Sequence, residues 1–114
     1  MTARIKSRLW VEALLRRCQS EGNFGAVVNT GADDAGAVYV AIHHLNGTYD
    51  LLGPPAGPSH SENGERQFRK VFAQPVAWEE LRSHLEKQRK YDSDIWLVEI
   101  EDRDGLAGLP LLAE

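Results

Sequence analysis

The fold is decided by Gly36-Ala-Val-Tyr-Val-Ala-Ile-His-His-Leu45 and Thr48-Tyr-Asp-Leu-Leu-Gly53, two mostly apolar runs that Asn46-Gly47 joins. Asparagine and glycine both tolerate the positive φ angles of a type I′ turn. An Asn-Gly pair between two such runs is the strongest short-range signal for a β-hairpin. The sequence therefore predicts two antiparallel strands, over 36–45 and 48–53.

A two-residue turn also sets which residues of the hairpin face one another. It places His44 opposite Tyr49 and His43 opposite Asp50. Because side chains alternate between the two faces of a sheet, His43 and Asp50 are expected together on the face away from the core. The side chains expected on the core face are Val38, Val40, Ile42 and Leu51.

Periodicities on both sides of the hairpin predict the remaining elements. Residues 7–20 have the apolar spacing of a helix, and residues 24–29 have that of a short first strand. A fourth strand is expected at 67–72, a second helix begins near Pro75, and a last strand covers 95–102. The predicted fold is α+β, a mainly antiparallel sheet of four to five strands with both helices packed on one side of it.

The length of the chain predicts one domain. A chain of 114 residues has the commonest single-domain size, so residues 1–114 are expected to share one core. Residues 54–66 are rich in proline, glycine and polar residues and predict a flexible loop. Residues 104–114 form a leucine-rich tail that is too apolar for a free end, so it is expected to pack on the domain or on a partner.

The predicted helix at 7–20 has an unusually wide apolar surface. Its apolar side chains spread over about two-thirds of the circumference, where an ordinary surface helix shows a narrower stripe. We expect the sheet to cover one side, and a second copy of the chain is a candidate cover for the other. Arg17 projects into this apolar arc. An unpaired buried charge costs several kcal/mol, so the guanidinium must either be paired or reach out of the interface to solvent. We expect a carboxylate partner on the neighbouring sheet. Glu99 and Glu101 are candidates for it, although a solvated polar face of the last strand is the favoured interpretation of these two residues.

Charge and cysteine content bear on partners and compartment. The net charge is −4, whereas a nucleic-acid binder usually carries a basic excess. Nucleic-acid binding is kept only as an alternative, through a local basic patch that includes Arg69 and Arg82. Cys18 is the only cysteine and cannot form an internal disulfide, which fits a reducing cytoplasm. No segment resembles a signal peptide or a membrane span.

The nearest approach to a catalytic motif is His43 opposite Asp50. A carboxylate can orient an imidazole for acid–base work, but no nucleophile accompanies the pair, and a solvated cross-strand pair is the favoured interpretation. His43, His44, His60 and His84 lack the spacing of metal ligands. The sequence therefore predicts no catalytic residue, no metal site and no cofactor.

Several segments resemble a family of short bacterial proteins. They are Arg8–Val11, Ala13–Arg17, Ala35–Val38, Tyr91-Asp92 and Trp96–Arg103. The family is domain-of-unknown-function family number fourteen-ninety-one, and the resemblance covers residues 4 to about 103. It implies a bacterial cytoplasmic protein of one domain. It implies no activity, substrate or catalytic residue.

Three functional hypotheses follow. The leading one is a non-catalytic interaction module that forms a homodimer through the first helix or the leucine-rich tail. The second is a small-molecule-binding protein or small enzyme with a pocket near Arg17, His43 and Asp50, to which Glu99 and Glu101 are added as candidate ligand-binding residues. The third is a nucleic-acid-binding accessory protein. Membrane association is not expected.

Overall fold

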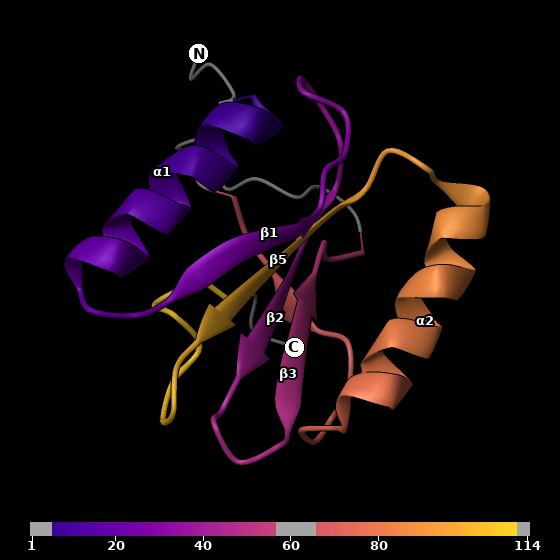
Figure 1. Ribbon diagram of the computed structural model, residues 1–114. Helices are drawn as coiled ribbons and strands as arrows, with labels where there is room; N and C mark the ends of the chain where they lie inside the picture. The colour runs from indigo at the N-terminus through magenta and orange to yellow at the C-terminus, as the bar shows by residue number, and fades with distance from the viewer. Residues whose placement is uncertain (1–5, 57–65, 112–114) are drawn as a thin grey trace.

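The computed structural model describes residues 6–56 and 66–111, which hold two helices and a five-stranded sheet (Figure 1). The spatial order of the strands is β1-β5-β2-β3-β4. All neighbours are antiparallel except β2 and β5, which run parallel. This confirms the predicted α+β fold. In chain order the elements are α1 Ser7–Ser20, β1 Gly25–Asn29, β2 Val38–His43, β3 Tyr49–Gly53, β4 Arg69–Lys70, α2 Trp78–Tyr91 and β5 Trp96–Glu101.

The two helices lie on opposite faces of the sheet (Figure 1). On the α1 face, Val11 and Leu14 pack in one core cluster with sheet residues such as Val98. On the α2 face, Leu81 and Leu85 pack in a second cluster. The prediction of both helices on one side is therefore wrong. A strand parallel to an earlier neighbour requires a crossover connection, and α2 provides it on the face that α1 leaves open.

The hairpin forms, but its register differs from the predicted one by one residue. The loop is longer than two residues: φ is +62° at Leu45 and +86° at Gly47, and the His44 amide donates to the Thr48 carbonyl at 3.0 Å. The Asn46 side chain accepts from the Thr48 amide at 3.0 Å. The resulting pairs are His43↔Tyr49, Ile42↔Asp50, Ala41↔Leu51 and Val40↔Leu52.

This shift moves side chains between the faces, because the period of a strand is two. Asp50 lies on the α1 face beside Ile42, and Leu51 lies in the α2-side cluster. The predicted placement of Leu51 with Ile42, and of Asp50 with His43, is therefore wrong.

The second cover of α1 comes from the same chain. Leu106 and Leu109 pack with Trp10 and Leu15 against the α1-side cluster. They belong to residues 102–111, which we call the C-terminal segment and which runs beside α1. The outermost part of the apolar arc stays in solvent, with Leu9 56% exposed. The described part of the leucine-rich tail thus packs on its own domain.

Two predicted features fall largely outside the described residues. They are the flexible loop, of which residues 57–65 are not described, and the end of the tail, residues 112–114. Within the described ranges, neither helix has the length and apolar character needed to cross a bilayer.

Candidate functional site

The structure divides the predicted ligand-binding residues between two faces of the sheet. His43 stacks on Tyr49, with ring centroids 4.6 Å apart, on the α2 face. Glu101 is the register partner of His43, and Glu99 is that of Ala41, so both carboxylates lie on that face too. Asp50 and Arg17 lie on the α1 side. The predicted pocket that combines Arg17, His43 and Asp50 is therefore not assembled.

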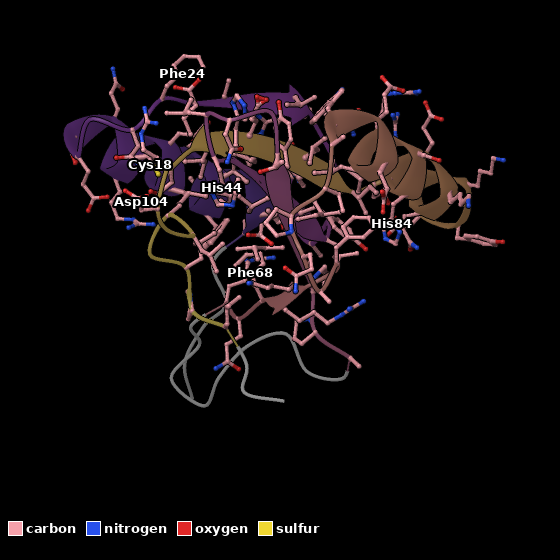
Figure 2. All side chains as sticks on the ribbon, turned by 90° about the horizontal axis from the view of Figure 1, so that it is seen from below. Cys18, Phe24, His44, Phe68, His84 and Asp104 are labelled. Atoms are coloured by element: carbon pink, nitrogen blue, oxygen red, sulfur yellow. The ribbon has the colours of Figure 1, made fainter. Side chains whose placement is uncertain are left out.

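Asp50 pairs with the histidine next to the predicted one. Oδ2 of Asp50 lies 2.9 Å from Nε2 of His44, and Nδ1 of His44 lies 2.9 Å from the carbonyl oxygen of Asp102. The side chains of His44 and Asp50 are 12% and 6% exposed. Figure 2 shows His44 between the sheet and the C-terminal segment. The pair therefore links the hairpin to that segment.

Both ring nitrogens of His44 face acceptors. A carbonyl oxygen can only accept, so Nδ1 carries a proton, and an imidazolium donates from Nε2 to the carboxylate as well. Burial alone lowers the pKa of His44, but the hydrogen bonds to Asp50 and to the Asp102 carbonyl, with the negative charge of Asp50, outweigh burial and raise it. No ring nitrogen is left to take a proton from a nucleophile. The pair therefore has a structural role: it holds the hairpin against the C-terminal segment.

Arg17 has a different partner from the one predicted. Its Nη2 donates to the carbonyl oxygen of Ala107 at 2.5 Å, and Nη1 lies 3.5 Å from Oε1 of Glu21, the residue that follows α1. The predicted pairing with Glu99 or Glu101 is wrong. The side chain of Arg17 remains 40% exposed, so the guanidinium is anchored at one end and open to solvent at the other.

Arg17 lines a groove that the sequence did not reveal. The groove runs between α1 and the C-terminal segment and has a volume of about 520 Å³. Its lining residues are Trp10, Ala13, Leu14, Arg17, Arg66, Gly108, Leu109 and Pro110. The guanidinium of Arg66 lies over the Trp10 ring, 5.3 Å from its centroid. The groove thus combines two guanidinium groups with an aromatic and aliphatic wall.

A second surface follows β1, the strand at one edge of the sheet. Phe24 is 65% exposed, and Figure 2 shows it at the outer border of the sheet. Val28 is 49% exposed. Beside it, a hollow of about 240 Å³ opens between the end of β1 and α2, with Val28, Trp78 and Leu97 among its lining residues. This edge carries exposed apolar side chains next to an apolar recess.

A comparison with known families decides the relationship of the chain. The model of the family described as protein of unknown function DUF1491 matches residues 5–109. The chain belongs to the DUF1491 family. This confirms the resemblance found in the sequence.

Solved structures support the family and the fold. The solution structure of protein Atu0922 from A. tumefaciens is 37% identical, covers 98% of each chain and has a TM-score of 0.83. A crystal structure of a DUF1491 family protein from Caulobacter crescentus is 32% identical, covers 95% of this chain and 99% of that chain, and has a TM-score of 0.76. No protein with a curated description matches the chain.

The basic patch considered for nucleic acid is partly neutralised in this DUF1491 chain. Arg82 pairs with Glu79 at 2.9 Å and with Glu86, and these hydrogen bonds raise the pKa of Arg82. Within the described ranges, no three His, Cys, Asp or Glu side chains gather as a metal-ligand set, and His60 lies outside those ranges.

Proposed function

We propose that this protein is a non-catalytic interaction module of the bacterial cytoplasm that forms a homodimer through the edge of β1. The observation that carries the proposal is the open, apolar and uncharged edge strand. Most apolar side chains of α1 and of the described tail pack within the chain. The edge of β1 therefore replaces these two elements as the expected dimer surface.

The backbone of β1 offers hydrogen-bonding groups to a partner. The Phe24 carbonyl accepts from the Glu101 amide at 2.8 Å, and Ala26 lies opposite Glu99. In an antiparallel ladder such bonded positions alternate with positions that point outward. The N–H and C=O groups of Gly25 and Val27 therefore point away from β5, toward the open edge.

Natural edge strands are usually protected by charges or proline. Residues 23–29, Asn-Phe-Gly-Ala-Val-Val-Asn, contain neither. The bulge between Val27 and Asn29 interrupts the ladder. The part of the edge that can pair is therefore limited to the few residues on either side of Ala26. The edge is short, and no strand in the described part of the chain pairs with its outer side.

A second copy fits this edge better than an unrelated chain because the edge is self-complementary. An antiparallel pairing about a two-fold axis at Ala26 sets Gly25 opposite Val27 of the second copy, with both pairs bonded. The same register sets Phe24 opposite Val28 of the second copy. Val28 borders the apolar hollow, so each copy would place its exposed ring at the recess of the other.

The non-catalytic part of the proposal is supported by His44. Its two ring nitrogens are both engaged, at 2.9 Å each, by Asp50 and by the Asp102 carbonyl. The stack of His43 on Tyr49 lies on the other face, away from this carboxylate. Neither histidine is arranged as a general base with an oriented carboxylate.

The test is Phe24→Ala, with Tyr91→Ala as the matched control. Both rings are exposed, 65% and 90%, so neither change should disturb the fold. A phenylalanine side chain offers about 200 Å², and burial of about 130 Å² contributes up to about 3 kcal/mol for each copy. Phe24→Ala should thus weaken the dimer at least about a hundredfold, as measured by sedimentation over a dilution series.

A second variant tests the backbone contact. Val27→Pro removes an N–H that points away from β5, which an edge strand tolerates, and should give a monomer, whereas Val27→Thr retains the N–H and should still dimerise. A wild-type protein that stays monomeric up to about 1 mM contradicts the proposal. Its binding free energy would then be weaker than about −4 kcal/mol. Equal dimerisation of Phe24→Ala and Tyr91→Ala also contradicts the proposal.

A further inference from the structure

A strip of the sheet on the α2 face carries two carboxylates beside stacked aromatic rings. It is formed by Glu99 and Glu101 of β5, His43 of β2 and Tyr49 of β3. We infer that this strip docks an arginine-bearing segment of a partner protein, with the guanidinium group held by the two carboxylates against the His43 ring. Because β5 lies inside the edge strand β1, the docking goes beyond the dimer contact and does not require it.

The two carboxylates of the strip have no positive partner in the described part of the chain. Glu99 and Glu101 are two residues apart on β5, so both side chains lie on one face, about 7 Å apart along the strand. Both are partly buried. Among the ion pairs of the described residues, none includes Glu99 or Glu101. The strip therefore presents two formal negative charges that a cation from another molecule can neutralise.

The charge of the strip extends beyond β5. Burial and, after it, the negative charges of Glu99 and Glu101 raise the pKa of Tyr49, which lies two strands away. A surface with a negative potential attracts a cationic partner and repels an anionic one. A metal ion is not the cation indicated, because in the described ranges no three His, Cys, Asp or Glu side chains form a ligand group. The charge therefore indicates an organic cation.

The aromatic side of the strip is held in place by packing. The rings of His43 and Tyr49 are stacked, with centroids 4.6 Å apart and planes 14° from parallel. Tyr49 also contacts Trp78 at the start of α2, with centroids 5.2 Å apart. Strands β3 and β5 flank β2, so Tyr49 covers one face of the His43 ring and the other face is turned toward Glu101. A flat ring face therefore borders the carboxylate.

The combination of carboxylates and a ring face selects arginine among the cationic side chains. A guanidinium group is planar, packs on aromatic faces and donates five N–H groups in its own plane. It can therefore stack on His43 and donate to both carboxylates, whereas the ammonium group of lysine is a compact point charge. From β5 to β3 the strip spans about 10 Å, which is wider than one guanidinium group. A chain segment that also supplies neighbouring groups fits it better than a free guanidinium compound.

The experiment is an NMR titration of the whole chain labelled with ¹⁵N. The probe is the acetylated and amidated peptide Ala-Arg-Ala-Arg-Ala, and the matched control replaces both arginines by citrulline, which keeps the shape and loses the charge. We expect saturable shifts of the Glu101 and His43 amide signals with the arginine peptide. The citrulline peptide should bind at least about tenfold more weakly. A lysine peptide and acetylated arginine amide should each bind at least about threefold more weakly.

Two variants separate the strip from the net charge of the protein. Glu101→Gln should weaken binding of the arginine peptide at least about tenfold. Glu12→Gln removes the same charge from an exposed position of α1, on the other face of the sheet, and should change binding by less than about twofold. If Glu101→Gln does not fold, the comparison of the arginine and citrulline peptides on the wild-type protein remains decisive.

The inference is overturned by the absence of a shift at Glu101 with about 5 mM arginine peptide, by equal binding of the arginine and citrulline peptides, or by equal losses in the two variants. Shifts confined to Gly25 and Val27 would place the peptide at the edge of β1 and would overturn it as well. If sedimentation shows a monomer and the arginine peptide still shifts Glu101, the dimer is contradicted and this inference is supported.

Discussion

Neutralising one buried carboxylate should change how stability depends on pH. Asp50 is 4% exposed and shares its Oδ2 with His44 at 2.9 Å. Among the described residues its Oδ1 has no hydrogen-bond partner. The ring of His44 is thus the hydrogen-bond partner that this carboxylate has among the described residues. Asp50→Asn keeps the size of the side chain and removes the charge.

The sign follows from the raised pKa of His44. Below the ordinary value of about 6.5, the folded and unfolded chains both carry the proton, so the pair stabilises fully. Between that value and the raised pKa, only the folded chain keeps it. The free energy of unfolding therefore falls as pH rises through this window, by up to about 1.4 kcal/mol per pH unit.

Asp50→Asn should remove this slope, because an amide does not hold the imidazolium. Breaking a buried ion pair from one side costs about 3 kcal/mol, so at pH 6 the variant should be less stable than the wild type by that order. The gap should narrow toward pH 9. Asp33→Asn is the control, since Asp33 forms an ion pair with Arg8 at 2.8 Å but is 64% exposed.

Urea unfolding between pH 5.5 and 9, followed by tryptophan fluorescence, measures these values. Burial, the largest cause, and the nearby Arg69 and Lys87 lower the pKa of His84. That histidine therefore adds stability that rises with pH below about 6.5, and it cancels in the difference between wild type and variant. Parallel curves for the wild type and Asp50→Asn above pH 6.5 would refute the assignment of the proton to the His44–Asp50 pair.

Three further outcomes test the packing. Arg17→Ala should lower the free energy of unfolding by about 1 kcal/mol, because the side chain donates to a backbone carbonyl but is 40% exposed; Arg16→Ala should lower it by under about 0.5 kcal/mol, and equal losses in urea unfolding would contradict the contact. Gly31→Ala should abolish cooperative thermal melting in circular dichroism, since its Cβ would lie 2.1 Å from the Asp94 carbonyl oxygen; a native melt would show that the loop can move aside. Cys18 is 1% exposed and burial raises the pKa of its thiol, so mass spectrometry should detect iodoacetamide modification only in denaturant.

Local signals in the sequence predicted most of the elements. The helix expected at 7–20 is observed as Ser7–Ser20, and the strand expected at 95–102 is observed as Trp96–Glu101. Both elements have strong periodicity; α1 buries one face, and β5 buries apolar side chains on both faces of the sheet. The strand expected at 67–72 shrinks to Arg69–Lys70, while Phe68 bridges to Leu111 instead. A short edge segment takes its pairing from distant neighbours, so local pattern is a weak guide there.

Non-local pairing and loop geometry explain the errors. The parallel pairing of β2 with β5 joins residues far apart in the chain, and no dipeptide signals it. At the hairpin, Leu45 takes a φ of +62°, which is uncommon for a leucine. The loop is therefore longer than two residues, and the register of the hairpin shifts by one residue. One residue of slip replaces His43 by His44 as the partner of Asp50. The chemistry of a strand pair thus depends on a single turn angle.

Two surfaces remain open on opposite faces of the sheet. On the α1 face the helix lies so close to β1 that a Cβ on Gly25 would be 2.8 Å from Leu15. Arg17 reaches the C-terminal segment on that same side through the Ala107 carbonyl. Phe24 precedes Gly25 and is in register with Glu101, so its ring faces the α2 side, where it is 65% exposed. Because the sheet lies between them, the contacts removed by Phe24→Ala and by Arg17→Ala share no partner, and their effects should be independent.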